Sequence, residues 1–261
     1  MDIYHIILLF SVAFGASWLT FFSGFGLGTM LTPVFYFMFN DLILAISATA
    51  IVHLLNNVFK FILMQKSVNW RIVLPFGLTA IPAAALGAYI SKHFNEKVIL
   101  FDYNILEYTK EIQLINVLFG IILIGFALIE LIPSWSVAFS KQKLWLGGVI
   151  SGFFGGFSGH QGALRTAFLV KYQLDKFTFI ASGIVIAMVI DITRIPFYFS
   201  DYSSEDFEAQ WIHIICALAG ALFGAIIGRY YLKKVKLNTL NIVVSLAMII
   251  FGLTLGLGLL E

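Results

Sequence analysis

Long apolar stretches dominate this chain and restrict what it can fold into. Eight segments, each with few charged residues, approach the roughly 20 residues that an α-helix needs to cross a bilayer. They lie near residues 3–23, 42–64, 71–91, 112–132, 143–157, 177–199, 211–231 and 239–259. Only 11% of the 261 residues are charged, against about 25% in a soluble domain. We therefore expect a multi-pass protein of the cell membrane, with the bacterial inner membrane as the expected location.

Two shorter apolar segments, 28–39 and 162–172, each follow a glycine-rich break. At about 1.5 Å per residue, neither is long enough to cross a bilayer alone. We interpret each as a half-helix that forms a hairpin with the segment before it. The predicted fold is an all-α membrane protein with eight long transmembrane helices plus two short half-helices.

The order of these elements occurs twice, which indicates an internal repeat. The polar residues that a shift of 134 superimposes are Asp41 and Asp175, Asn57 and Asp191, and Lys60 and Arg194. We predict two transmembrane repeats, residues 1–132 and 133–261. Because each has five elements, the second enters the membrane from the opposite side, and the repeats are inverted.

Small residues at intervals of four give a second alignment, with a shift of 137. It superimposes Ala83, Gly87 and Ser91 on Gly220, Gly224 and Gly228. This spacing lets helix backbones approach closely in a membrane. Such residues are also common in membrane helices in general, which is the alternative reading.

Charged connections orient the chain. The net basic ones hold Lys66 and Arg71, Lys141 and Lys143, Lys171 and Lys176, and Lys233, Lys234 and Lys236. The connection with Asp201, Glu205, Asp206 and Glu208 has no Lys or Arg. The positive-inside rule places the basic connections in the cytoplasm. Both termini, and the mixed-charge connection 92–110, are then expected outside.

The two breaks are the predicted binding site, because transporters with inverted repeats bind substrate at broken helices near the membrane centre. Helix N-termini near Gly28 and Gly162 would point their N–H groups and positive dipole ends at the cavity, which favours an anion. Plain helix kinks are the alternative. The predicted substrate-binding residues are Gly26, Gly28, Thr29, Asn57, His160, Gln161, Gly162, Arg165, Asp191 and Arg194.

Charges inside apolar segments sharpen this prediction. An arginine at the bilayer centre costs about 2.5–3.5 kcal/mol on insertion scales, so Arg165 needs a cavity or a partner. The alternative is that it only neutralises Asp191. Lys60 and Arg194 line the cavity or snorkel to the interface. We expect His160 to contact substrate, and a histidine there would suit proton coupling. His53 is expected to be a satisfied core histidine.

Several function classes are disfavoured. A net charge of +2 without a basic stripe argues against nucleic acid. The chain has no HExxH, Gly-x-Ser-x-Gly or metal-spaced Cys/His motif, so we expect no enzyme activity, cofactor or metal. The expected partners are a small anionic substrate and the lipid bilayer. An anion channel stays open as the alternative, with a membrane-embedded enzyme behind it.

The first break, the short segment with Pro33, Asp41 and the following run 45–51 resemble the sulfite exporter TauE/SafE family. The second break, 151–159, resembles that family's second repeat. The resemblance spans nearly the whole chain and implies export of sulfite or organosulfonates by a secondary mechanism. This chain departs from the family pattern in having His160, Gln161 and Ala167, with Arg165 between, where members generally carry glycines and a proline.

Overall fold

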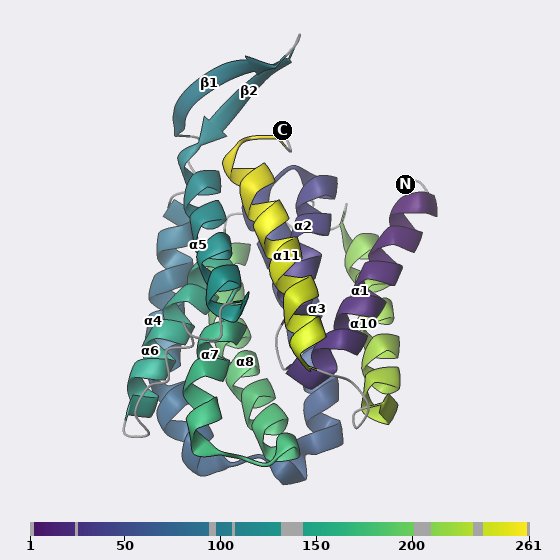
Figure 1. Cartoon of the computed structure of the whole chain (residues 1–261), viewed down its shortest axis with the longest axis vertical. Coiled ribbons are helices and arrows are strands. Elements are labelled where there is room, and N and C mark those ends of the chain that lie inside the picture. The colour runs from purple at the N-terminus through teal and green to yellow at the C-terminus, as the bar shows by residue number, and fades with distance from the viewer. Residues whose placement is uncertain are drawn as a thin grey trace.

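The chain folds into a bundle of helices with a β-hairpin at one end (Figure 1). The computed structural model describes residues 3–23, 26–93, 98–105, 108–131, 143–200, 210–231 and 237–259. Its helices are α1 (Ile3–Ser23), α2 (Leu27–Phe39), α3 (Leu42–Met64), α4 (Trp70–His93), α5 (Leu114–Leu131), α6 (Leu144–Ser158), α7 (Gly162–Leu169), α8 (Lys176–Phe199), α10 (Trp211–Tyr231) and α11 (Leu237–Gly256). Short 3₁₀ turns, η1 (Gln65–Ser67) and η4 (Val170–Tyr172), follow α3 and α7.

A helical membrane protein is confirmed. Within the described ranges, five helices are long and apolar enough to cross a membrane, namely α1, α3, α4, α8 and α10. Shorter apolar helical stretches lie in α2, α5, α6 and α11. Lipid offers no hydrogen bonds to an open backbone, so a helix is the conformation that such apolar segments adopt there.

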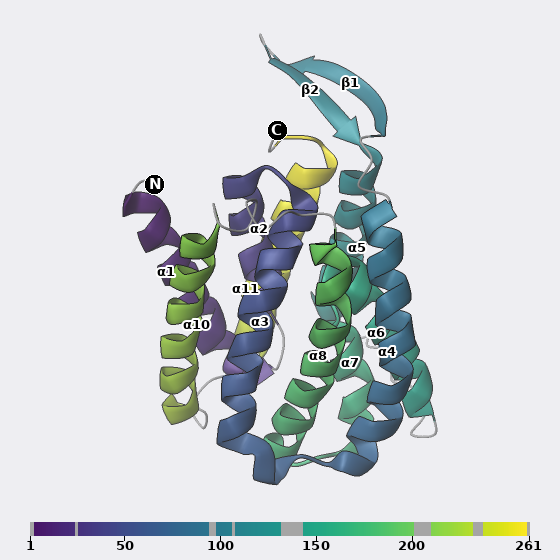
Figure 2. The ribbon, with the colours of Figure 1, turned by 180° about the vertical axis from the view of Figure 1, so that it is seen from behind.

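Two of the short helices arise where glycine breaks a longer apolar run. Gly26 precedes α2 with φ of 112°, and Gly159 follows α6 with φ of 80°, values that suit glycine because it lacks a Cβ atom. Figures 1 and 2 show α2 returning toward the end of the bundle that carries the β-hairpin, whereas α7 returns toward the opposite end. Both half-helices begin at the predicted breaks.

An aspartate caps the helix that follows each half-helix, Asp41 for α3 and Asp175 for α8. The Asp41 carboxylate accepts a hydrogen bond from Leu44 N at 2.8 Å, and Asp175 accepts from Phe177 N and Thr178 N. Hydrogen bonds from the side chain and backbone of Thr178 hold the pKa of the Asp175 carboxyl below its usual range. These caps satisfy N–H groups that the first helical turn leaves open. The 134-residue shift thus superimposes two residues with the same local role.

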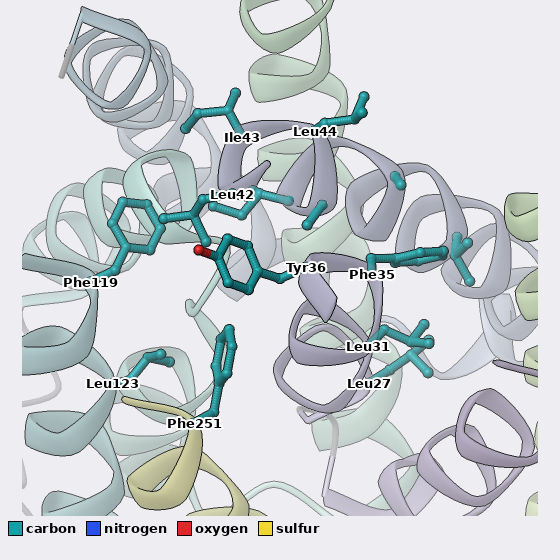
Figure 3. Close-up of a cluster of buried hydrophobic side chains, with 14 of the residues drawn as sticks. Leu27, Leu31, Phe35, Tyr36, Leu42, Ile43, Leu44, Phe119, Leu123 and Phe251 are labelled. Atoms are coloured by element: carbon teal, nitrogen blue, oxygen red, sulfur yellow. The ribbon is translucent and has the colours of Figure 1, made fainter. Parts of the chain in front are cut away.

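The short helix α2 lies inside the bundle, in contact with α1, α3 and α11. Figure 3 shows its side chains Leu31 and Tyr36 within the apolar core, with Phe251 of α11 near the Tyr36 ring. The two ring centroids are 6.2 Å apart. Burial of the α2 face that carries Leu27, Leu31 and Phe35 explains why an apolar segment too short to span a membrane is stable there.

Glycines bring two pairs of helices into backbone contact. Along the contact between α4 and α6, a Cβ atom added to Gly152 would lie 2.6 Å from Ala80 O. Along the contact between α1 and α10, a Cβ atom on Gly224 would lie 3.0 Å from Trp18 N. Gly87 and Gly220 meet neighbouring backbone in the same way. The close packing predicted from the small-residue spacing is confirmed at these positions.

A two-stranded hairpin, β1 (Ile99–Ile105) and β2 (Tyr108–Gln113), was not among the predicted elements. Isoleucine, phenylalanine and tyrosine at alternate positions of 99–105 favour a strand, but the segment was interpreted only as a mixed-charge connection. The Tyr103 hydroxyl donates to Leu257 O at 2.6 Å, which ties the hairpin to the end of α11.

Elements that are expected on the same side of the membrane lie at the same end of the bundle. The first turn of α1, the last turn of α11 and the hairpin lie at one end, and η1 and η4, with Lys66 and Lys171, lie at the other (Figures 1 and 2). The repeat boundary at 132/133 falls outside the described residues. So do both chain ends, the acidic residues of 201–208 and the basic residues Lys141, Lys233, Lys234 and Lys236.

A glycine substitution tests the helix contact. Gly152→Ala should lower stability by about 1–3 kcal/mol, because the new Cβ atom overlaps the α4 backbone. The measurement is thermal unfolding in detergent. Gly125→Ala is the matched control, since a Cβ atom at Gly125 of α5 meets nothing within 4 Å. Equal midpoints for the two variants would contradict close packing of α4 on α6.

Cysteine labelling tests the sidedness. With Cys216 replaced by alanine, a cysteine at Thr109 of β2 should react with an impermeant maleimide in intact cells, and one at Lys66 should react only after lysis. The basis is the placement of Lys66 and the hairpin at opposite ends of the bundle, with the basic end inside. Labelling of Lys66→Cys in intact cells, with Thr109→Cys protected, would invert the orientation.

Candidate functional site

The two glycine breaks meet at one cavity inside the bundle. A Cβ atom built on Gly28 would lie 3.9 Å from Gly159 O, so the breaks are almost in van der Waals contact. The cavity has a volume of about 20 Å³, which holds about one water molecule. Its lining residues are Gly26, Gly28, Thr29, His53, Phe126, Gly159, His160, Gln161, Gly162, Ala163, Arg165 and Met248.

Two helix N-termini border this cavity. The first intrahelical bonds run from Met30 N to Gly26 O and from Arg165 N to Gln161 O, both 3.0 Å long. The N–H groups before these bonds have no partner within their own helix. Since they lie at the positive ends of α2 and α7, the cavity favours a negatively charged ligand.

The second break contributes buried polar side chains. His160, Gln161 and Arg165 are each at most 5% exposed. Both ring nitrogen atoms of His160 and the side-chain oxygen of Gln161 lack a hydrogen-bond partner among the described residues. A buried polar atom without a partner is costly. Such atoms around a small cavity therefore indicate a place where a polar ligand binds.

Arg165 lies in the first turn of α7 and packs against α8. A Cβ atom added to Gly183 would lie 3.3 Å from Arg165 Nε, so the guanidinium occupies the space that this glycine leaves. It lines the cavity, as predicted. Ser151 Oγ donates to Gln161 O at 3.1 Å and holds the break just before this turn.

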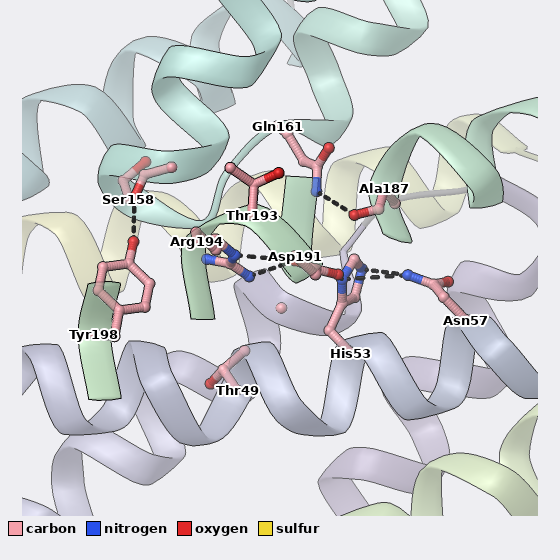
Figure 4. A network of polar contacts seen from close by, with 12 residues as sticks. Thr49, His53, Asn57, Ser158, Gln161, Ala187, Asp191, Thr193, Arg194 and Tyr198 are labelled. Atoms are coloured by element: carbon pink, nitrogen blue, oxygen red, sulfur yellow. Dashed lines mark hydrogen bonds and ion pairs between the residues drawn. The ribbon is translucent and has the colours of Figure 1, made fainter. Parts of the chain in front are cut away.

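A buried charge network stands behind the cavity (Figure 4). Asp191 of α8 is fully buried, and its Oδ1 accepts from Arg194 Nε at 3.0 Å and lies 2.8 Å from the terminal nitrogen Nη2. Its other oxygen, Oδ2, is 2.6 Å from His53 Nδ1 of α3. Arginine stays protonated at any physiological pH. Asp191 is therefore the counter-charge of Arg194, and it also links α8 to α3.

Further contacts fix Arg194 in this network. Its guanidinium carbon lies 5.9 Å from the centre of the Tyr198 ring, and the Tyr198 hydroxyl donates to Gly156 O of α6. A Cβ atom on Gly159 would lie 2.7 Å from the Arg194 guanidinium, so glycine is required there for space as well as conformation. The network therefore joins α3, α8 and the second break.

His53 is the site residue that the sequence analysis passed over. It has the partner expected of a core histidine, but it also lines the cavity. The Asn57 side-chain nitrogen lies within 3.4 Å of both ring nitrogens. Among the predicted site residues, Asn57, Asp191 and Arg194 do not line the cavity but reach it through His53. The overlooked signal was the position of His53 one helical turn before Asn57.

The snorkelling alternative is wrong for Lys60 and Arg194, because they are 4% and 1% exposed. With the Asn56 amide oriented to satisfy both its groups, its oxygen accepts from Lys60 Nζ at 3.1 Å. The same amide nitrogen then donates to Ser17 Oγ and Ala221 O, each at 3.2 Å. Lys60 thus belongs to a second buried polar cluster, between α1, α3 and α10.

The geometry of two broken hairpins around one anion-favouring cavity agrees with comparison to known proteins. The sulfite exporter TauE/SafE family matches residues 9–255. The chain belongs to this family. The match includes both breaks, the cavity and the charge network of this TauE/SafE protein. Comparison with curated proteins and with solved structures gave no match. Within the described residues, no three His, Cys, Asp or Glu side chains cluster as metal ligands would.

Removing the charge of Asp191 should destabilise the bundle. Asp191→Asn leaves the buried Arg194 guanidinium without its counter-charge, which costs about 3–5 kcal/mol in buried pairs. The measurement is the unfolding midpoint in detergent. The double variant Asp191→Asn, Arg194→Gln should recover part of the loss, because no uncompensated charge remains. A fully stable single variant would show that Arg194 is not dependent on Asp191.

Proposed function

We propose that this protein is a secondary transporter of a small anion of the sulfite or organosulfonate type, and that the anion binds where the two broken hairpins meet. It would act as a carrier and not as an enzyme, in the bacterial inner membrane. The observation that carries the proposal is the shared cavity, with Arg165 and two helix N-termini around it. Membership of a sulfite exporter family supports the substrate class.

The chemistry of Arg165 suits such an anion. Its guanidinium can hold a sulfonate or carboxylate through two parallel hydrogen bonds, whereas the compact ammonium of lysine binds as a point charge. Backbone N–H groups at the start of α7 would add donors to the same oxygen atoms. His160 and Gln161, with partnerless atoms beside the cavity, would complete the set.

We further propose that the chain consists of two inverted repeats and that eight long helices cross the membrane, with α5, α6 and α11 joining the five longest. The helix contacts support this arrangement. Under the 134-residue shift, α1 corresponds to α6, α3 to α8 and α4 to α10. The contact of α4 with α6 then corresponds to that of α10 with α1, and α4 with α8 to α10 with α3. Both pairs of contacts are present.

The cavity volume favours a carrier over a channel. About 20 Å³ is too small for a sulfite ion or a sulfonate group. The hairpins must separate before an anion enters, and inverted-repeat carriers achieve this when one bundle of helices rocks against another. A channel would instead need a continuous ion path.

Arg165→Lys tests the site. Under this proposal, Arg165→Lys keeps the positive charge but loses the two parallel hydrogen bonds of the guanidinium. It should bind sulfite or methanesulfonate at least tenfold more weakly, about 1.4 kcal/mol. Binding is measured as the ligand-induced shift of the unfolding midpoint in detergent, and transport as flux into proteoliposomes. The midpoint without ligand should barely change.

Arg71→Lys, an exposed residue at the start of α4, is the matched control and should leave binding unchanged. Unchanged transport together with a large loss of stability in Arg165→Lys would mean that Arg165 holds the bundle together. The anion site would then lie elsewhere.

A further inference from the structure

The His53 side chain links the cavity to the buried charge network. Its side chain is 11% exposed and borders the cavity, and its Nδ1 lies 2.6 Å from Asp191 Oδ2. An ionised carboxylate only accepts hydrogen bonds, so Nδ1 carries a hydrogen in this contact. The second ring nitrogen, Nε2, is then the position at which His53 gains or loses a proton.

We propose that His53, held by Asp191, takes up the proton that is coupled to transport, so that one anion and one proton occupy the cavity together. This inference rests on the proposed anion transport and adds its coupling group. A hydronium ion of the solvent gives its proton to Nε2, so one O–H bond breaks, one N–H bond forms and water remains; on release the proton returns from Nε2 to water. No other bond changes.

A proton on His53 adds to a net positive charge around the cavity, so it requires a negatively charged group close by. Around the cavity, the guanidinium groups of Arg165 and Arg194 and the carboxylate of Asp191 leave one net positive charge. A proton on His53 raises this to two. The added charge lies beside Oδ2 of Asp191. Arg194 contacts the other carboxylate oxygen, Oδ1, so Oδ2 is left for His53. A singly charged anion in the cavity would offset one of these two positive charges.

The surroundings of His53 distinguish it from His160. His53 contacts Asp191 of α8, which contacts Arg194, and Tyr198 lies beside Arg194. His160 and Arg165 line the same cavity as His53. Lys60 lies two turns further along α3, beside Asn56. The other facing elements contribute Thr29 of α2, Phe126 of α5 and Met248 of α11. His160 lines the same cavity but has no carboxylate partner among the described residues. Of these two cavity histidines, only His53 contacts a carboxylate among the described residues.

Protonation also changes Nε2 of His53 from a hydrogen-bond acceptor to a hydrogen-bond donor. With Nε2 unprotonated, it can accept from the Asn57 side-chain nitrogen, 3.4 Å away (Figure 4). Once protonated, Nε2 is a donor that faces another donor. Either the Asn57 amide turns its oxygen to Nε2, or an oxygen of a bound anion accepts the bond. Proton binding and anion binding therefore strengthen each other, and by linkage the effect is reciprocal.

The first test measures methanesulfonate binding between about pH 5.5 and about pH 8, the range in which histidine titrates. A sulfonate stays ionised throughout, so any pH dependence belongs to the protein. Wild-type affinity should rise as the pH falls, by tenfold per pH unit at most for one coupled proton. His53→Gln should bind with an affinity that does not vary with pH. His160→Gln should bind more weakly at every pH yet keep the wild-type slope.

The second test follows protons directly. In proteoliposomes with a pH-sensitive dye inside, an inward methanesulfonate gradient should acidify the lumen through the wild-type protein. His53→Gln should pass methanesulfonate down its gradient without moving protons. His93→Gln, an exposed histidine at the end of α4, is the matched control and should behave as wild type.

The outcomes separate the two proposals. If the wild-type protein neither binds nor moves methanesulfonate or sulfite, the proposed function fails. If it moves methanesulfonate but no protons, or if His53→Gln still moves protons, the function stands and His53 is not the coupling group. Loss of the pH slope in His160→Gln, with the slope retained in His53→Gln, would also overturn the assignment. Where His53→Gln does not fold, the pH slope of His160→Gln decides: a wild-type slope keeps the assignment, and loss of the slope overturns it.

Discussion

Two interruptions of α-helix lie deep in an apolar bundle, and lipid cannot hydrogen-bond the backbone groups that they expose. The breaks at Gly26 and at Gly159 must therefore be enclosed by protein, and each lies against the other. Enclosure of both breaks requires that α2 and α7 be surrounded by longer helices, with α3 and α8 beside them. The cavity exists because the hairpin tips meet there. Its affinity for anions follows from the same constraint, since the enclosed groups include N–H donors at two helix N-termini.

Charge inside such a bundle is stable only when it is offset. Asp191 is bound by Arg194 and His53, and Lys60 by the Asn56 oxygen, so the buried charges form two separate clusters. The clusters differ in a way that matters for function. One combines opposite charges and reaches the cavity through His53, whereas the other has a single charge that is met by neutral polar groups. If the repeats are related as we propose, Asn57 and Lys60 of the first match Asp191 and Arg194 of the second. The proton-binding pair would then combine His53 of the first repeat with Asp191 of the second, and the cavity would also belong to both.

The membrane helices, the two half-helices and most cavity residues could be predicted because their signals are local. A long apolar segment indicates a membrane helix, and a glycine-rich break indicates where a helix is interrupted. An arginine inside an apolar run needs a cavity or a partner, because its charge is costly in lipid. The role of His53 could not be predicted in this way, because it depends on Asp191, 138 residues away. The partner of Asp191 was ambiguous for the same reason, since Arg165 and Arg194 both lay within reach of it. The hairpin was missed for a different reason: the alternating apolar residues of 99–105 are a local signal for a strand, but the connection 92–110 was interpreted by its charges alone.

The closed cavity indicates which contacts must change during transport. Glycine-rich surfaces between α4 and α6, and between α1 and α10, bring backbone against backbone, and a tightly packed contact of this kind moves as one body. The contacts between α3 and α8 differ, because there the His53–Asp191 pair spans the two helices. An ion pair between moving bodies makes their separation sensitive to proton binding, since the charge on one side changes. The proposed coupling would therefore act where α3 of the first proposed repeat meets α8 of the second, and the tightly packed pairs α4–α6 and α1–α10 would each move as a unit and transmit the movement to the hairpins.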